Sequence, residues 1–374
     1  MNDYDDLFDK DNDFKQEVIY TKTNYQDDHA SQFYRRAQED KRNGLLIAIY
    51  ILISLLVSFL GGLIINQEYG YLEEGINSIE VISEVSFIVI DNINPDTNEI
   101  DTLNPYEVFV TGVYINNYDK VFPVFNVEVE FFDIANQSLG VQTFTKENFE
   151  AGEEFAIDYS LIVSVEPITI TSSIYVDAPS MIYTLISLVQ VTITAVLFFI
   201  VDKLNFKKDW EDFKENRKVR VSNIFTGFLL VYASLIVANL ILTLLGVVET
   251  SQNEIVIQSL FSDDPLNLFI LFIVLCVLTP IVEEVVFRKV IFNFVEPRSN
   301  YKVAIAMTGI IFGLMHVISF GDFIQSIPYI MMGFVFGYIY WKSNKNIYVV
   351  ISVHFLNNFL SWLIYVLMIY GITF

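Results

Sequence analysis

Long apolar runs alternate with short polar loops over most of the chain. Crossing about 30 Å of hydrocarbon takes roughly 20 helical residues. Runs of about that length occupy 44–65, 180–201, 223–247, 266–292, 303–320, 324–341 and 346–370. This pattern predicts an α-helical polytopic membrane bundle of about seven spans, and the last run is long enough to be bent or split.

The segment between the first two runs, residues 67–179, has a different pattern. Apolar and polar residues alternate in stretches such as EVFVTGVYI (107–115) and FNVEVEFFD (125–133), and turn-rich stretches such as NNYDK and EAGEE separate them. Alternation between turns is typical of the strands of a small antiparallel sandwich. We expect an inserted all-β sandwich domain, whose strand and turn order loosely resembles extracytoplasmic immunoglobulin-like modules.

Composition supports the membrane assignment, because 53% of the residues are hydrophobic and only 18% are charged. The first 43 residues are polar and rich in Asp. We expect them to form a disordered acidic cytoplasmic tail. No small-residue cleavage pattern follows the first apolar run, so 44–65 is expected to be an anchor and not a signal peptide. Cys276 is the only cysteine, which excludes an intramolecular disulfide.

Basic residues are distributed by loop. Lys and Arg precede the first run and recur at 203–220, 289–302 and 342–345, whereas 248–265 and 321–323 contain none. The positive-inside rule then predicts a cell-membrane protein with a cytoplasmic N-terminus and with 67–179 outside. The chain would divide into that outer domain, a transmembrane helix with a basic cytoplasmic loop (180–222) and a helical bundle (223–374).

The outer segment is strongly acidic. It holds 21 Asp and Glu against Lys120 and Lys146, a local charge of −19. A charge of this size repels nucleic acid and attracts cationic peptides or divalent ions. A face that is merely solvated remains an alternative, and no catalytic constellation stands out in this segment.

Three ionisable residues, whose insertion into a membrane costs free energy, lie within the run 266–292, in EEVVFR (283–288). Ionisable residues inside a membrane normally face a bundle interior or an aqueous cavity. Glu284 and Arg288 are four residues apart, so they share a helix face and can form a structural ion pair. Glu283 points elsewhere and has no local partner, which makes it a candidate for chemistry.

The histidines indicate where Glu283 points. His316 ends FGLMH in the fifth run, and His354 begins HFLNN in the seventh, four residues before Asn358. A carboxylate can take a proton from water, one imidazole can hold that water, and another with an amide can stabilise an oxyanion. A Ser or Cys nucleophile paired to a base is not evident. Glu283, His316 and His354 could also bind a divalent metal such as zinc, although no HExxH motif is present.

The order EExxxR, FxxxH, HxxxN on successive membrane helices resembles the CAAX-protease and bacteriocin-processing (CPBP or Abi) family of intramembrane endopeptidases. The resemblance covers roughly 223–366. It implies that Glu283 is the general base, that His316 helps to position the attacking water, and that His354 and Asn358 stabilise the oxyanion. It also implies an eight-helix bundle that opens towards the cytosol and the membrane.

We therefore expect an intramembrane endopeptidase that cleaves a membrane-associated peptide or protein near the cytosolic side. The main alternative is a non-catalytic membrane binding or bacteriocin-immunity scaffold, in which the acidic outer domain captures a cationic or peptide partner. A transporter with a Glu/His proton relay is a third reading, which the lack of an internal repeat of spans disfavours.

Overall fold

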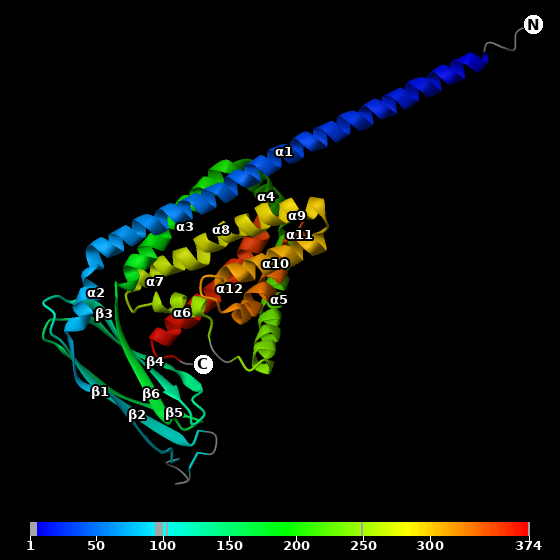
Figure 1. Cartoon of the computed structure of the whole chain (residues 1–374). Helices are drawn as coiled ribbons and strands as arrows, with labels where there is room; N and C mark the ends of the chain where they lie inside the picture. Colours follow the sequence, from blue (N-terminus) through cyan, green and yellow to red (C-terminus); the bar gives the residue numbers. More distant parts are fainter. Residues whose placement is uncertain (1–5, 94–99, 102–103, 248–249, 373–374) are drawn as a thin grey trace, which may run out of the picture.

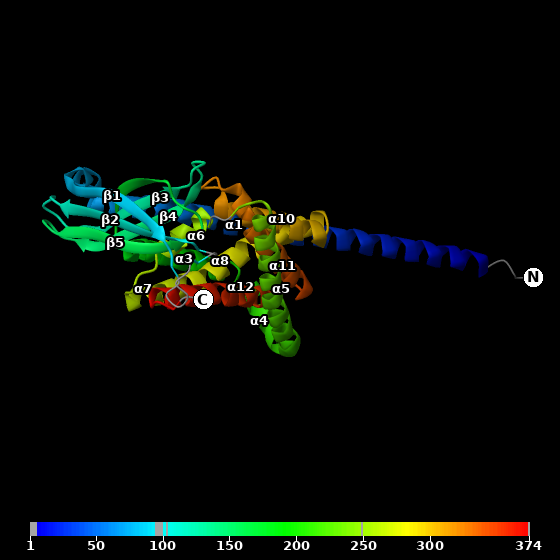
Figure 2. The ribbon, with the colours of Figure 1, turned by 90° about the horizontal axis from the view of Figure 1, so that it is seen from below.

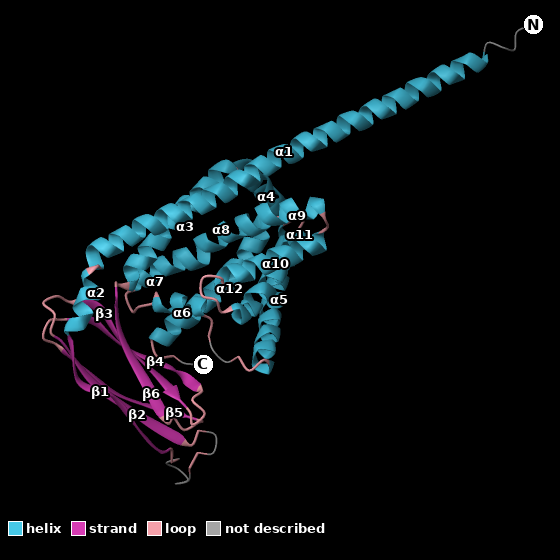
Figure 3. Ribbon diagram, in the orientation of Figure 1, coloured by secondary structure: helices cyan, strands magenta, loops and turns pink. Residues whose placement is uncertain are grey.

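The computed structural model describes residues 6–93, 100–101, 104–247 and 250–372, with side chains from residue 36 onward. Helices form one part and strands the other (Figure 3). The main helices are α1 (Asp6–Tyr69), α3 (Ser180–Val201), α4 (Lys203–Glu215), α5 (Arg217–Leu244), α6 (Gln252–Ser259), α10 (Tyr301–Val317), α11 (Ser326–Lys342) and α12 (Ile347–Ile369). Short pieces include α2 (Tyr71–Gly75) and the turn Phe323–Gln325.

Six helical segments in the described part of the chain are long and apolar enough to cross a membrane: Arg36–Tyr69, Ser180–Val201, Arg217–Leu244, Pro265–Arg298, Phe323–Lys342 and Ile347–Ile369. They confirm a polytopic helical membrane protein. The expected span 303–320 corresponds to α10, which has 17 residues and is shorter than the other six.

The segment Pro265–Arg298 is not a uniform α-helix. It runs from α7 (Pro265–Leu271) through a π-helical stretch (Phe272–Leu278) into α8 (Thr279–Glu284), and then through a second π-helical stretch (Val285–Phe292) into α9 (Asn293–Val295). Pro280 has no N–H and its ring would clash with the carbonyl four residues earlier, so a wider turn just before it relieves the conflict. The two glutamates of EEVVFR therefore lie between two π-helical stretches, which are often found at functional sites.

The β strands form two three-stranded antiparallel sheets, ordered β1-β2-β5 and β4-β3-β6. The strands are β1 (Ile79–Asp91), β2 (Tyr106–Asn116), β3 (Phe122–Phe132), β4 (Ser138–Phe149), β5 (Glu154–Val163) and β6 (Thr169–Asp177). Both sheets contribute to one core, with Val108 and Ile157 from one and Phe125 and Phe149 from the other. An antiparallel β insert is thus present, and its immunoglobulin-like character stays a prediction.

The N-terminal segment differs from the expected disordered tail. Residues from Asp6 onward continue the first membrane helix without a break as α1. Residues 6–43 contain neither Pro nor Gly. Extending an existing helix avoids the cost of nucleating a new one, so the anchor can propagate helix into this polar stretch.

The β domain lies beyond one end of the helical bundle, near α6, α7 and the C-terminal end of α12 (Figure 1). The view from below shows the same neighbours (Figure 2). In Figure 1, α4 and α9 lie towards the opposite end. The stretches that hold most of the basic residues are therefore at the end of the bundle that faces away from the β domain.

Candidate active site

A fully buried ion pair anchors the EEVVFR motif. Nε of Arg288 lies 3.0 Å from Oε2 of Glu284, and both side chains are 0% exposed. The guanidinium also donates to the Gly333 carbonyl (3.3 Å). Three phenylalanine rings surround it at 5.2 to 5.6 Å from its central carbon. Cation–π contacts and the ion pair together compensate for removing the charge from water.

Glu284 also contacts His354, a link that the sequence did not predict. Nδ1 of His354 lies 2.9 Å from Oε1 of Glu284. An ionised carboxylate only accepts hydrogen bonds, so Nδ1 carries the proton that it donates. The His354 ring stacks on Phe336 at 4.7 Å. Glu284 and Phe336 therefore fix the ring, and its other nitrogen, Nε2, faces Glu283 with 3.7 Å to Oε2.

Glu283 keeps an oxygen for a ligand. Oε2 is buried and has no hydrogen-bond partner among the described residues. A buried carboxylate oxygen without a partner is costly. The side chain nevertheless lines a cavity of 660 Å³. The side chain is 22% exposed, so water in the cavity can reach the carboxylate, while Oε2 itself is enclosed beside the His354 ring.

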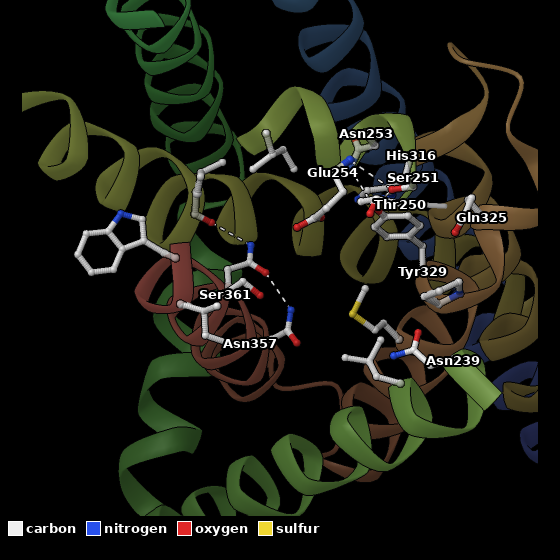
Figure 4. Close-up of a pocket in the computed structure, with 18 of the residues that line it drawn as sticks. Asn239, Thr250, Ser251, Asn253, Glu254, His316, Gln325, Tyr329, Asn357 and Ser361 are labelled. Carbon is white, nitrogen blue, oxygen red and sulfur yellow. Dashed lines mark hydrogen bonds between the residues drawn. The ribbon is translucent and has the colours of Figure 1, made fainter. Parts of the chain in front are cut away.

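His316 lines the same cavity. Its Nδ1 lies 2.7 Å from the Phe312 carbonyl, and because a carbonyl only accepts, Nδ1 is the donor. In the neutral ring Nε2 is then the acceptor. The ring stacks on Tyr329 at 4.5 Å, and the Tyr329 hydroxyl contacts Ser251 (2.9 Å) and Asn253 (3.2 Å). Figure 4 shows these side chains on one wall of the cavity.

Asn358 has a structural bond in addition to its place in the cavity wall. Its side-chain amide donates to the Leu275 carbonyl (2.9 Å), and its oxygen accepts from the amide of Asn357 (3.1 Å). Leu275 lies in the first π-helical stretch, where the backbone carbonyls are not in regular α-helical pairing. Asn358 therefore ties α12 to the irregular turn that precedes the glutamates.

The cavity reaches one end of the bundle only. Its lining residues come from the second half of α5, the region of α6, the middle of Pro265–Arg298 with Glu283, the end of α10, the start of α11, and α12 from its middle onward. They include Asn239, Thr250, Glu254, His316, Gln325, Tyr329, Asn357, Ser361 and Tyr365. These helix halves adjoin 248–265 and 321–323, the loops without Lys or Arg.

The expected opening towards the cytosol and the membrane stays a prediction, because the loops that adjoin this cavity are the ones without Lys or Arg. Thr250 is exposed and lines the cavity just before α6, which lies at the bundle end nearest the β domain (Figure 1), so the cavity reaches the surface there; we call this part the mouth. Asp202, Asp209 and Lys289 form ion pairs near the opposite end, with Lys289 Nζ 3.0 and 2.9 Å from the two carboxylates. Those buried contacts pack the bundle on the basic side.

The metal prediction was tested against the side-chain arrangement. Among the described residues no three His, Cys, Asp or Glu side chains are grouped as a metal site. Nδ1 of His316 and Nδ1 of His354 each donate a hydrogen bond, which leaves Nε2 as the ring atom that could bind a metal. Metal binding by Glu283, His316 and His354 stays a prediction.

Part of the chain that holds this site is similar to known proteins. Residues 265–360 match the family model described as "Type II CAAX prenyl endopeptidase Rce1-like". These residues carry an Rce1-like domain. The domain contains EEVVFR, FGLMH and HFLNN, so the resemblance drawn from the three motifs is confirmed.

Two curated relatives match part of the chain. The Bacillus subtilis protein named "Putative membrane peptidase YdiL" is 32% identical over 113 residues, which are 30% of this chain and 43% of that protein. An uncharacterised Mycoplasma capricolum protein is 32% identical over 165 residues, 41% of this chain and 46% of that protein. The chain thus spans less than half the length of either relative. No solved structure matches it.

The sequence pattern did not indicate several of the residues that line the cavity. Asn357 lies in the HFLNN motif and lines the cavity, although only its neighbour Asn358 was predicted to be a site residue. Tyr329 and Glu254 belong to no recognisable spacing and reach the cavity only because α11 and α6 pack beside α10. The two π-helical stretches likewise follow from local backbone geometry, for which Pro280 was the one available hint.

Proposed function

We propose that this protein is an intramembrane endopeptidase of the CAAX-protease-like family, in which Glu283 and a histidine activate water to hydrolyse a peptide bond. One observation carries the proposal: the partly exposed Glu283 carboxylate lines a cavity together with His316 and His354, with one oxygen 3.7 Å from Nε2 of His354. The membrane bundle and the Rce1-like match support the same conclusion.

In the proposed reaction, water binds between Glu283 and the accepting Nε2 of His316. Glu283 takes one proton as the water oxygen bonds to the peptide carbonyl carbon. The carbonyl oxygen becomes an oxyanion. The C–N bond then breaks, and the proton held by Glu283 passes to the leaving amine. The products are a carboxylic acid and an amine, which balances the added water.

His354 is suited to stabilise the oxyanion when it is protonated. Glu283 and Glu284 bring two negative charges and Arg288 one positive charge, so a protonated His354 makes the cluster neutral. With Nδ1 held by Glu284, the proton on Nε2 would lie between Oε2 of Glu283, 3.7 Å away, and an oxyanion in the cavity. The amide of Asn358 has a second hydrogen beyond its bond to Leu275, and we assign it to the same oxyanion.

The proposed orientation has the N-terminus in the cytoplasm and residues 67–179 outside the cell membrane. The distribution of Lys and Arg supports it. In this orientation the cavity opens on the outer side, together with the β domain, which we propose to be an immunoglobulin-like module for binding or positioning a partner.

The test compares membranes carrying the wild type or Glu283→Gln, at matched protein levels, by mass spectrometry of peptide termini. Termini that are present only with the wild type would support the peptidase and identify a substrate. His316→Gln and His354→Gln should remove the same termini.

The strong acidity of the outer domain favours one second candidate, a non-catalytic scaffold that captures a cationic partner. Identical termini in wild type and Glu283→Gln, with both proteins folded, would exclude the peptidase and leave this scaffold.

A further inference from the structure

The mouth of the cavity contains a second carboxylate, from Glu254 of α6. Ser251 caps this helix by accepting a hydrogen bond from the Glu254 backbone N–H (3.2 Å). The cap fixes the first turn of α6 over the bundle. In Figure 4 the Glu254 side chain extends into the cavity, beside Asn253 and opposite Asn357 and Ser361.

The Glu254 carboxylate has neither a hydrogen bond nor an ion pair among the described residues, although it is partly buried. The residues that line the cavity include no Lys or Arg. Burial raises the pKa of Glu254 above its ordinary value, and no nearby cation lowers it. A positive charge that entered the cavity would supply the missing partner.

The other polar groups near Glu254 are neutral and already oriented. The Tyr329 hydroxyl contacts both Ser251 and Asn253, and the Tyr329 ring stacks on His316. The wall that carries Glu254 is therefore continuous with the wall that carries His316. A substrate residue bound at Glu254 would thus enter the same cavity as the scissile bond.

The surroundings of the mouth have the same sign of charge. The β domain, which carries a charge of −19 over residues 67–179, lies at the end of the bundle where the cavity opens (Figure 1). Such a field raises the local concentration of cationic chains and opposes anionic ones. The long-range field and the local carboxylate favour the same class of substrate.

We propose that Glu254 is a specificity residue that receives a Lys or Arg side chain of an extracytoplasmic polypeptide entering the cavity. This inference rests on the proposed peptidase function for the cleavage that follows binding, but the binding step can be measured without cleavage. Glu254 is assigned to recognition, and Glu283 retains the chemistry.

The experiment uses the full chain in nanodiscs with Glu283→Gln, so that bound peptides are not consumed. It is incubated with an equimolar pool of short peptides in which one position carries Lys, Arg, norleucine, Gln or Glu, and retained peptides are quantified by mass spectrometry. A charge-assisted hydrogen bond predicts roughly tenfold enrichment of Lys and Arg over norleucine. Glu254→Gln should abolish most of this enrichment, and Glu254→Lys should favour Glu peptides instead.

Glu154→Gln is the matched control, because it removes one exposed carboxylate from β5 and leaves the cavity unchanged. It should keep the enrichment within about twofold of the Glu283→Gln protein, as expected for one screened surface charge. Equal enrichment with and without the Glu254 carboxylate, or no enrichment in either, would overturn the proposal. A Glu254-dependent enrichment in a protein whose wild type cleaves nothing would instead overturn the peptidase function.

Discussion

Replacing Glu284 by Gln should destabilise the bundle far more than the same change at Glu283, although the two residues are adjacent. Glu284→Gln preserves the shape and can still accept a hydrogen bond from His354. It leaves the fully buried Arg288 guanidinium without its ion-pair partner. Removing one partner of a buried pair costs about 3 to 5 kcal/mol. Since Glu283 still contributes a negative charge nearby, we expect about 3 kcal/mol, or on the order of 100-fold in the unfolding equilibrium.

Cys276 provides the assay, because it is the single cysteine and its side chain is buried in the first π-helical stretch. When opening is fast, its labelling by a thiol-reactive fluorophore follows the open fraction. The labelling rate should rise on the order of 100-fold in Glu284→Gln. In Glu283→Gln it should rise less than about fivefold, because no buried pair is broken.

A double variant separates the charge effect from the loss of shape. Glu284→Gln with Arg288→Met removes both charges, and such replacements of buried pairs are often neutral. It should label more slowly than Glu284→Gln alone. Equal labelling rates for Glu284→Gln and Glu283→Gln would refute the assignment of Glu284 as the partner that stabilises Arg288.

Three further predictions test other parts of the molecule. Thr250→Cys, on the exposed approach to α6, should react in intact cells with a membrane-impermeant thiol reagent, whereas labelling only after permeabilisation would reverse the proposed orientation. Gly313→Val should destabilise the bundle by about 1 to 3 kcal/mol through overpacking, because a Cβ there would lie 2.3 Å from a side chain of α11. Gly44→Ala is the control and should leave stability unchanged, because nothing lies within 4 Å of a Cβ at that position. Thermal unfolding in detergent compares the two variants. Retention of Lys peptides should increase with pH as Glu254 loses its proton. The midpoint of this increase should lie above 4.5, the ordinary pKa of a glutamate, because burial raises the pKa of Glu254 in the protein without bound peptide. In Glu254→Gln the retention should no longer depend on pH in this range.

Most of the architecture could be predicted, because buried positions recur along the sequence as long apolar runs in membrane helices and as alternating apolar residues in strands. The alternating stretches 107–115 and 125–133 correspond to β2 (Tyr106–Asn116) and β3 (Phe122–Phe132). The seven apolar runs correspond to seven apolar helices, of which α10 is the short one. The tail before residue 44 was expected to be disordered, whereas from Asp6 onward it is helical. Its sequence has no clear helical period of its own, because the helix continues from the neighbouring membrane segment.

The sequence by itself determined which residues could carry chemistry, since ionisable groups are expensive in a membrane and few are present. It identified Glu283, Glu284, Arg288, His316 and His354 as outliers of this kind. Tertiary structure decided how they are connected. The bond between Glu284 and His354 joins residues 70 positions apart and exists only because α8 packs against α12. The direction of the cavity was decided in the same way, because it depends on which helix ends remain uncovered and no local spacing records that.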